Sequence, residues 1–167
     1  NNGNFLYEVW DGNEWVYVRE GSNLTNEEIG HVRIYENTGN NYQLINEIDG
    51  EFRTDNSGSS VSLSSDGSVV AVGAGSNDGN GSNSGHVRIY QDVNGTWTQL
   101  GSDIDGEKQF DYSGYSVSLS DDGTKVAIGA FGSDGNVSHN SGYFWRDKYL
   151  TRMGHTRIFQ YSSGSWV

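Results

Sequence analysis

Alternating hydrophobic and polar residues run through most of the chain, in short segments divided by turns. The clearest segment, residues 58–90, reads GSSVSLSSDGSVVAVGAGSNDGNGSNSGHVRIY. Aliphatic side chains alternate with small polar ones on both sides of Asp66-Gly67, a pattern typical of two β-strands joined by a tight turn. We therefore predict a β-hairpin here, followed after a Gly/Asn/Ser loop by a further strand that begins at His86.

The same pattern repeats along the chain. GHVRIY occurs at 30–35 and 85–90, and GHTRIF occurs at 154–159. The first two start 55 positions apart (85 − 30) and the last two 69 positions apart (154 − 85), so the last copy contains an insertion. GYSVSLSDDGTKVAIGA at 114–130 copies the hairpin of the first segment. A repeat of this length is typical of propellers and other repeat arrays.

Counting outward from the Asp66-Gly67 turn predicts the register of the hairpin. Leu63 should pair with Val70, and Val61 with Val72, on one face. Ser62 and Ala71 then pair on the other face. The same rule in the second copy pairs Leu119 with Val126, Val117 with Ile128 and Ser118 with Ala127. One face is aliphatic and the other is mostly small, which predicts a sheet covered on both faces, with a neighbouring sheet close to the small side.

Two hairpins in succession predict a four-stranded antiparallel sheet of about 55 residues, the size of a propeller blade. The predicted fold class is all-β, with β-propeller-type blades in a ring that this chain alone does not complete; a two-sheet sandwich with similar strand spacing is the alternative. The predicted organisation is an N-terminal hairpin and polar link (1–29), a partial blade (30–57), a full blade (58–112), and a blade (113–167) with an insertion at 143–153 and a shortened last strand.

The two ends of the chain depart from the repeat. The hairpin at 5–20, which turns at Asp11-Gly12, reads as the same type as the following hairpin at 31–48, with Trp15 equivalent to the aromatic residue after each later turn. About two complete blades are fewer than the 4–8 that close a propeller. We therefore expect a processed product, a fragment or a subunit of a larger assembly.

Composition and charge exclude several classes of protein. The 167 residues contain no cysteine, so neither a disulfide framework nor a thiolate zinc site is possible. A formal net charge of −12 disfavours nucleic acid as a partner, because phosphate binding needs clustered lysine and arginine. No apolar run approaches the roughly 20 residues that a membrane span needs. We expect neither nucleic-acid binding nor membrane insertion.

The repeat resembles the FG-GAP repeat of integrin-α-like β-propellers over residues 30–167. Gly114-Tyr115 matches its Gly-aromatic start, Gly129-Ala130 its GA strand end, and 85–90 its later strand. LSSDGSVVAVGA followed by HVRIY is also similar to the blade pattern of WD-repeat propellers. The resemblance implies an extracellular or cell-surface propeller that binds ligands or mediates adhesion without catalysis.

The resemblance does not extend to calcium. Calcium-binding blades of the FG-GAP family carry a D-x-D-x-D-G loop between their first two strands. Here that place holds only the tight turns Ser65-Asp66-Gly67 and Asp121-Asp122-Gly123, which cannot supply the six to eight oxygens that Ca²⁺ requires. We expect no cofactor.

Basic side chains recur at fixed repeat positions: His31, His86 and His155, and Arg33, Arg88 and Arg157. Three equivalent histidines suggest a metal site, but one per blade places them apart around an axis, so a structural hydrogen bond is the favoured interpretation. For the arginines we favour ion pairs with carboxylates of a neighbouring blade over a shared anion site.

Acidic residues are candidates for a weak cation site or for turn stabilisation. The candidate metal ligands are Asp78, Asp103, Asp105 and Asp134. No acidic pair stands outside the repeat pattern, as a grafted active site would, so we predict no enzymatic activity. A glycosidase would need two carboxylates about 5–9 Å apart.

Aromatic residues recur after the outer hairpin turn: Tyr42, Trp97 and Trp166. We predict that they pack between neighbouring sheets, and the alternative is a stacking platform for a sugar in a lectin-like propeller. Possible N-glycosylation sites lie at Asn23, Asn80, Asn94 and Asn136. Their number is no more than chance gives.

The insertion at 143–153, YFWRDKYLTRM, is the one aromatic and basic stretch of an acidic chain. Aromatic and arginine side chains are enriched in the cores of protein interfaces. The predicted contact residues are Tyr143, Phe144, Trp145, Arg146, Lys148, Tyr149 and Arg152; a loop folded onto its own blade is the alternative. We predict a non-catalytic extracellular module that binds proteins, which are further copies of itself or the rest of a larger chain, and possible glycans.

Overall fold

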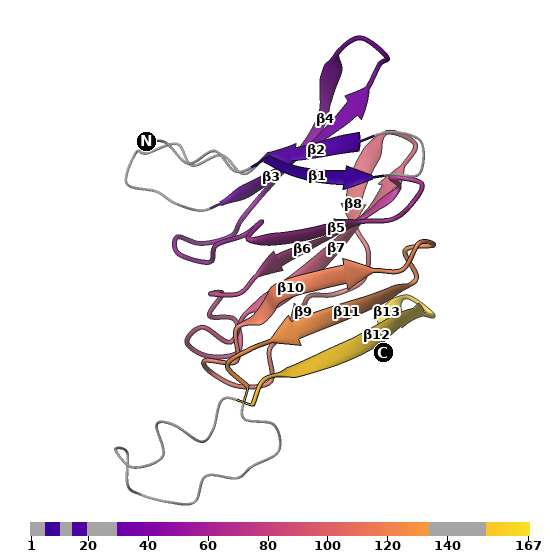
Figure 1. Cartoon of the computed structure of the whole chain (residues 1–167). Helices are drawn as coiled ribbons and strands as arrows, with labels where there is room; N and C mark the ends of the chain where they lie inside the picture. The colour runs from indigo at the N-terminus through magenta and orange to yellow at the C-terminus, as the bar shows by residue number, and fades with distance from the viewer. Residues whose placement is uncertain (1–5, 11–14, 20–29, 134–152) are drawn as a thin grey trace, which may run out of the picture.

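The computed structural model describes residues 6–10, 15–19, 30–133 and 153–167, and all regular structure within them is β. The strands form three antiparallel sheets that follow one another in chain order from the top to the bottom of Figure 1. The described residues include no helix, and therefore none long and apolar enough to cross a membrane. The predicted all-β class is confirmed.

Each sheet is assembled from consecutive strands. Sheet A comprises β1 (Leu6–Trp10), β2 (Trp15–Arg19), β3 (His31–Asn37) and β4 (Tyr42–Asp49). Sheet B comprises β5 (Ser60–Leu63), β6 (Val69–Ala74), β7 (His86–Val93), β8 (Thr96–Gln99) and β9 (Ile104–Asp105). Sheet C comprises β10 (Ser113–Leu119), β11 (Lys125–Ala130), β12 (His155–Ser162) and β13 (Ser165–Trp166).

The hairpin registers agree with those counted from the turns. In sheet B, Leu63 pairs with Val70 and Ser62 with Ala71. Sheet C repeats these pairs, and Leu119 lies opposite Val126. The register is set locally by a short loop, in which the Gly67 N–H donates to the Ser64 carbonyl at 3.0 Å and, in the second copy, the Gly123 N–H donates to the Ser120 carbonyl at 2.9 Å.

The carboxylate in each of these turns is used to hold the turn itself. The Asp122 carboxylate accepts hydrogen bonds from the Ser120 hydroxyl (2.6 Å) and from the Thr124 backbone N–H (3.0 Å). These bonds lower the pKa of Asp122 to about 2. Asp66 makes the equivalent bonds to Ser64 and Ser68, and its pKa is also lowered. These aspartates are therefore turn-stabilising residues.

Two hydrophobic cores lie between the three sheets. The first joins Val32, Ile34 and Ile48 of sheet A to Val61, Leu63, Val70 and Val72 on the aliphatic face of sheet B. The second joins Val69, Ala71, Val87, Ile89 and Ile104 of sheet B to Val117, Leu119, Val126 and Ile128 of sheet C. Sheet B is thus covered on both faces, as its pattern predicts.

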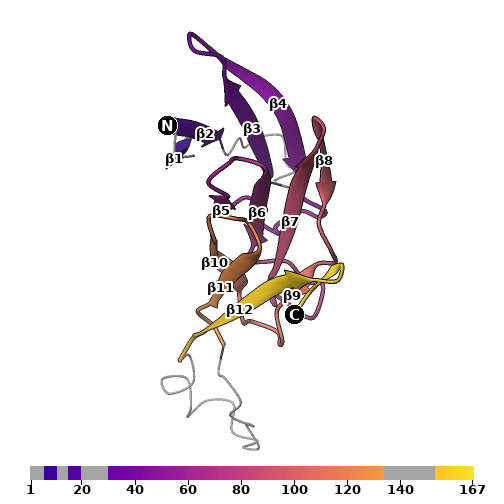
Figure 2. The ribbon, with the colours of Figure 1, turned by 90° about the vertical axis from the view of Figure 1, so that its right-hand side faces the viewer.

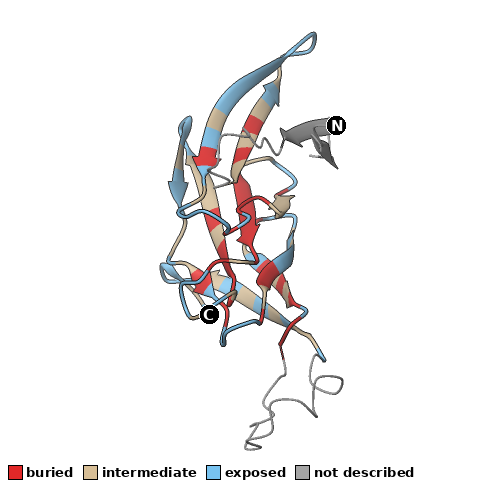
Figure 3. Ribbon diagram, turned by 90° about the vertical axis from the view of Figure 1, so that its left-hand side faces the viewer, coloured by how far each residue is buried: buried red, intermediate tan, exposed pale blue. Residues whose placement is uncertain are grey.

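Burial is concentrated in the middle of this stack. All six residues of β6 are buried, whereas the residues of β12 alternate between half-buried and exposed. The side view in Figure 2 shows the sheets one after another with the β3–β4 hairpin projecting beyond them, and Figure 3 shows its tip exposed. Three layers with two cores differ from the two-layer sandwich that the strand spacing also allowed.

The structure corrects our interpretation of the N-terminal hairpin. β1 and β2 lie in the positions of sheet A that β5 and β6 occupy in sheet B, so this hairpin is not a second copy of β3–β4 and Trp15 is not equivalent to Tyr42. The error came from matching Trp15 to the aromatic residue that follows each outer turn, and from the missing VSLS motif. The Asp11-Gly12 pair in fact matches the inner hairpins, at Asp66-Gly67 and Asp122-Gly123, whereas the later outer hairpins turn at Asn94-Gly95 and Ser163-Gly164.

Candidate functional site

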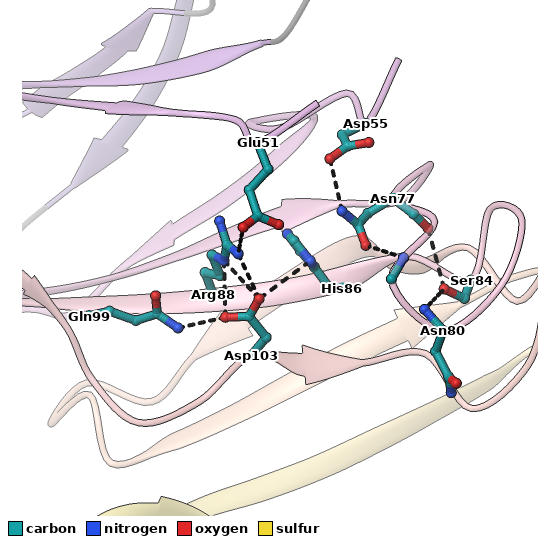
Figure 4. A network of polar contacts seen from close by, with 10 residues as sticks. Glu51, Asp55, Asn77, Asn80, Ser84, His86, Arg88, Gln99 and Asp103 are labelled. Atoms are coloured by element: carbon teal, nitrogen blue, oxygen red, sulfur yellow. Dashed lines mark hydrogen bonds and ion pairs between the residues drawn. The ribbon is translucent and has the colours of Figure 1, made fainter. Parts of the chain in front are cut away.

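A network of polar side chains fills the seam between sheets A and B (Figure 4). Arg88 on β7 binds Asp103, with its Nε 3.0 Å and its Nη2 2.7 Å from Asp103 Oδ2. The same Nη2 lies 2.5 Å from Glu51, which belongs to the link between β4 and β5. Gln99 donates to Asp103 at 2.6 Å, and His86 Nδ1 lies 3.8 Å from that carboxylate. One arginine therefore joins sheet B to the link that precedes it.

The electrostatics of this network follow from burial and pairing. Burial lowers the pKa of the His86 imidazole, and the neighbouring Arg88 lowers it further. Burial raises the pKa of Asp103, but hydrogen bonds from Arg88 and Gln99 outweigh it and lower the pKa overall. Burial lowers the pKa of Arg88, but its bonds to Asp103 and Glu51 outweigh this effect, so the pKa is raised overall. At neutral pH the network therefore contains a neutral imidazole beside a charged arginine–carboxylate group.

A second set of bonds fixes the loop between β6 and β7. The buried Asn77 side chain donates to Asp55 at 2.8 Å, which joins this loop to the β4–β5 link. Asn77 also accepts a bond from the Gly79 backbone N–H, and its backbone carbonyl accepts one from Ser84. The abundant Asn and Ser of the loop are therefore engaged in its own structure.

The repeat-equivalent basic residues make related but different contacts in the other two sheets. Arg157 of sheet C donates to the backbone carbonyl of Asp105 (2.6 Å) and to the Ser113 hydroxyl (3.2 Å). Arg33 of sheet A binds Glu47 in its own sheet at 3.0 Å. Each arginine lies in a separate sheet with its own partners, but among the described residues the predicted ion pair with a carboxylate outside its own sheet is found at Arg88, with Glu51. A partner outside its own sheet is found for Arg88, which binds Glu51 of the β4–β5 link, and for Arg157, which binds the Asp105 carbonyl of sheet B.

The histidines also lie apart, one in each sheet. His155 contacts the Ser133 hydroxyl at 2.7 Å through Nδ1 and lies 3.6 Å from Glu107 through Nε2. His31 Nε2 is buried and makes no hydrogen bond, although Glu47 lies 3.6 Å away. A hydrogen bond of the predicted kind is thus found at His155 and not at His31 Nε2.

Two groups of histidine and carboxylates within the described residues have the proximity of metal ligands: Glu51, His86 and Asp103; and His31, Glu47 and Asp49. In the first, the Arg88 guanidinium already binds both carboxylates, and its positive charge opposes a second cation. In the second, Arg33 binds one of the two carboxylates, that of Glu47. Both groups are best described as ion-pair networks.

The acidic residues singled out from the sequence are dispersed. Asp103 belongs to the Arg88 network, and Asp105 is an exposed residue of β9. Asp78 accepts the Asn83 backbone N–H at 2.7 Å, a turn contact. Asp134 lies outside the described residues. The structure therefore brings Asp103 and Asp105 to one strand edge and leaves Asp78 in a loop.

The recurring aromatic residues have two different environments. Trp97 packs against the A–B core and Trp166 against the B–C core, where its indole N–H donates to the Leu100 carbonyl at 2.7 Å. Both therefore lie between sheets, as the packing interpretation requires. The equivalent Tyr42 of sheet A is 46% exposed.

A cavity of about 370 Å³ lies at the edge of the B–C seam, next to Trp166. Its lining combines aromatic and charged side chains: Asp103, Asp105, Arg157, Phe159 and Trp166, with Ser102, Ile104 and Ser165. The Arg157 guanidinium lies 5.1 Å from the Phe159 ring centroid. The sequence could not reveal this site, because its residues come from two different repeats.

A second hollow, of about 340 Å³, lies on the face of sheet C that points away from sheet B. Ser116, Gly129 and Thr156 form a row across the sheet beneath it, and Tyr115, Phe131 and Met153 lie beside them. Tyr115 is 62% exposed and stacks edge-on against Phe131 at 4.6 Å. Ile158, on the same face, is 72% exposed.

The remaining predicted sites fall partly outside the described residues. Asn94 occupies the exposed β7–β8 turn, whereas the Asn80 side chain donates to the Gly106 carbonyl at 2.7 Å. Asn23 and Asn136 lie outside the described residues, as do the predicted contact residues of the insertion from Tyr143 to Arg152. Met153, the last residue of the insertion, is described and is 69% exposed.

The chain matches no known protein-family profile, and no curated protein is significantly similar to it.

Proposed function

We propose that this chain is a non-catalytic, extracellular repeat module that binds other proteins, as part of a cell-surface or filamentous assembly. In this proposal the sheets are blades of a β-propeller-type architecture, similar to FG-GAP propellers, that further sheets complete. The supporting observation is that the two ends of the stack expose large apolar side chains on faces whose counterparts in the middle are buried. Ile158 is 72% exposed in sheet C, whereas the equivalent Ile89 of sheet B is 1% exposed.

The use of the polar side chains supports a binding role over a catalytic one. Asp103 and Glu51 neutralise Arg88, and Asp66 and Asp122 hold turns. Carboxylates engaged in this way are poor general acids or bases, since their pKa values are low or their lone pairs are occupied. The chemistry of these residues therefore serves the scaffold.

The insertion is the proposed contact segment for the partner. It precedes β12 in the chain, and its last residue, Met153, lines the hollow beside Tyr115 and Phe131. Its basic residues are complementary to an acidic protein surface, such as that of a chain with net charge −12.

The test is a deletion of residues 143–153, compared with the full chain by static light scattering over a range of concentrations. We expect the deletion to reduce association and leave the thermal unfolding midpoint nearly unchanged, because the segment follows the completed β10–β11 hairpin. Unchanged association and partner binding would remove the contact role of the insertion. A full chain that stays monomeric and retains no protein from an extracellular fraction would contradict the proposed function.

Carbohydrate binding is a second candidate, favoured by the cavity at Trp166. An aromatic ring beside Asp105 and Arg157 is a lining that can stack on a sugar and bind its hydroxyl groups. In a glycan array, Arg157→Met should abolish any signal, while Trp97→Ala, outside this cavity, should preserve it. Equal loss in both variants would point to general destabilisation and count against this site.

A further inference from the structure

The outer face of sheet C is equivalent, position by position, to the face of sheet B that sheet C covers, and most of its residues are the same. The equivalent positions are Ser60 and Ser116, Ser62 and Ser118, Ala71 and Ala127, Gly73 and Gly129, Val87 and Thr156, and Ile89 and Ile158. Each pair occupies the same register position in its own sheet. The contacts of the covered face of sheet B therefore indicate which contacts the outer face of sheet C can make.

On sheet B this face bonds directly to the backbone of the next sheet. The Ser60 hydroxyl donates to the Gly114 carbonyl at 2.6 Å, and the Leu119 backbone N–H donates to the Ser62 hydroxyl at 2.9 Å. A Cβ atom on Gly73 would lie 2.1 Å from the Gly114 carbonyl oxygen. The row of small residues therefore lets the strand that starts sheet C approach closely.

On sheet C the same features are exposed. Ser116, Ser118 and Thr156 are all exposed, and a Cβ atom on Gly129 would meet only its own sheet, at the Ser116 side chain. The hollow of about 340 Å³ lies over the row formed by Ser116, Gly129 and Thr156. In sheet B the equivalent row, Ser60, Gly73 and Val87, lies against Gly114 of sheet C.

The opposite end of the stack has a complementary open face. On sheet A, Tyr42 and Leu44 are each 46% exposed on the side of His31 and Tyr35, whereas the equivalents of Tyr42 in the later sheets pack on the sheet before them. His31 Nε2 is buried and makes no hydrogen bond, while the equivalent His155 lies beside Glu107 of the preceding link. The outer face of sheet A therefore exposes residues whose equivalents in sheets B and C contact the preceding sheet or link.

We propose that copies of this chain associate head to tail, with the outer face of sheet A of one copy covering the outer face of sheet C of the next. This inference rests on the proposed protein-binding function and identifies the partner as a second copy. Each open face belongs to the same chain and is the continuation of an interface that the stack already forms twice, A on B and B on C. Such a heterologous contact generates a ring if it closes and a filament if it does not.

A difference in sequence between sheets B and C marks the border of the proposed contact surface on sheet C. Val69, which is buried against the Gly123 turn of sheet C, is replaced in sheet C by the exposed Lys125. A lysine at the border of an apolar sheet face discourages indiscriminate aggregation and suits the polar rim of a specific interface. The contact therefore centres on Thr156 and Ile158.

The experiment is sedimentation equilibrium of the full chain from micromolar to near-millimolar concentration, with variants of each face. Ile158→Glu should block the sheet C face and Leu44→Glu the sheet A face, each weakening association on the order of a hundredfold, since a charge would be buried without a partner. Val93→Glu makes the same change at an exposed aliphatic residue near the β7–β8 turn and is the matched control. Circular dichroism should show all three variants folded.

Mixing the two blocked variants distinguishes head-to-tail association from other modes. Each blocked variant alone should be monomeric, and an equimolar mixture should form heterodimers and nothing larger, because one intact interface remains. A monomeric wild type would overturn the proposal, as would association that Ile158→Glu and Val93→Glu alter equally. A wild type that is monomeric but binds another protein through residues 143–153 would overturn this inference and leave the proposed function standing.

Discussion

Sheets B and C have nearly the same sequence and differ in what covers them. In sheet B, Ile89 is 1% exposed and the Ser60 and Ser62 hydroxyls bond to the next sheet. In sheet C, the equivalent isoleucine, Ile158, is 72% exposed. The comparison teaches that the exposure of Ile158 follows from its position in the stack, because the small residues and the isoleucine of the covered face are kept in sheet C, while Val69 and Val87 are replaced by Lys125 and Thr156.

The polar seams show the same dependence on position. In the middle sheet, Arg88 binds both Asp103 of its own sheet and Glu51 of the preceding link. In sheet A, Arg33 binds Glu47 of its own sheet. In sheet C, Arg157 donates to the Asp105 carbonyl of sheet B and to the Ser113 hydroxyl of its own sheet. Among the described residues, the arginine of the middle sheet is therefore the one that pairs with two carboxylates.

The largest expected effect comes from placing the same charge on both isoleucines. Ile89→Glu should destabilise the fold by about 4 kcal/mol or more, because an unpaired carboxylate would be buried in the B–C core. Ile158→Glu should cost less than about 0.5 kcal/mol in dilute solution. Urea denaturation followed by tryptophan fluorescence measures both. Similar losses would mean that sheet C is covered within the single chain.

A smaller change probes the close approach between sheets. Gly73→Ala should cost about 2–3 kcal/mol, since the new methyl group would collide with the Gly114 carbonyl oxygen. Gly129→Ala should cost about 1 kcal/mol or less, because the exposed Ser116 side chain can rotate away. Thermal unfolding of the two variants at low concentration tests this. A larger loss for Gly129→Ala would reverse the comparison.

The arginines give the next effect. Arg88→Met should destabilise by about 2–3 kcal/mol, because it leaves the half-buried Asp103 without its cation. Arg33→Met removes a more exposed pair with Glu47 and should cost less than about 1 kcal/mol. Denaturant titrations in low and high salt measure the stability of both variants. The loss in Arg33→Met should be smaller in high salt, because salt screens an exposed ion pair. Equal losses of stability in the two variants would show that the Arg88 network stabilises the fold no more than the Arg33–Glu47 pair does.

The smallest effect is a dependence on pH. Because burial lowers the pKa of His86, the folded state takes up its proton at lower pH than the unfolded chain, whose histidine titrates near 6.5. Stability from this residue is complete above about pH 6.5 and falls as the pH drops through that value. The lowered pKa of Asp103 adds a further loss below about pH 4. Melting temperatures between pH 7.5 and 5.5 should fall for the wild type and less for His86→Gln; an equal fall in both would reject the assignment to His86.

Local patterns made much of the scaffold predictable from the sequence. The pairing of Leu63 with Val70, and the coverage of both faces of β6, follow from alternation and a short turn. The packing of Trp97 and Trp166 follows from their repetition at one position. These features depend on residues close together in the chain or on the repeat itself.

The site was harder to predict because it depends on contacts between repeats. Glu51 reaches Arg88 across the A–B seam, and no local pattern distinguishes it from other link residues. The sequence did not predict the position of β1–β2, because these strands lack the alternating small residues that mark β5–β6 and because Trp15 resembles the aromatic residues of the outer hairpins. Likewise, the exposure of Ile158 cannot be read from a motif that buries Ile89.

Cross-linking tests most directly the claim that the open faces of sheets A and C are two halves of one contact. The chain has no cysteine, so Leu44→Cys and Ile158→Cys each introduce a single thiol. A mixture of the two variants, treated with a short bismaleimide and analysed by mass spectrometry, should give the 44–158 link between copies in excess over the 44–44 and 158–158 links. Absence of the 44–158 link, or an excess of 158–158 links, would contradict the account.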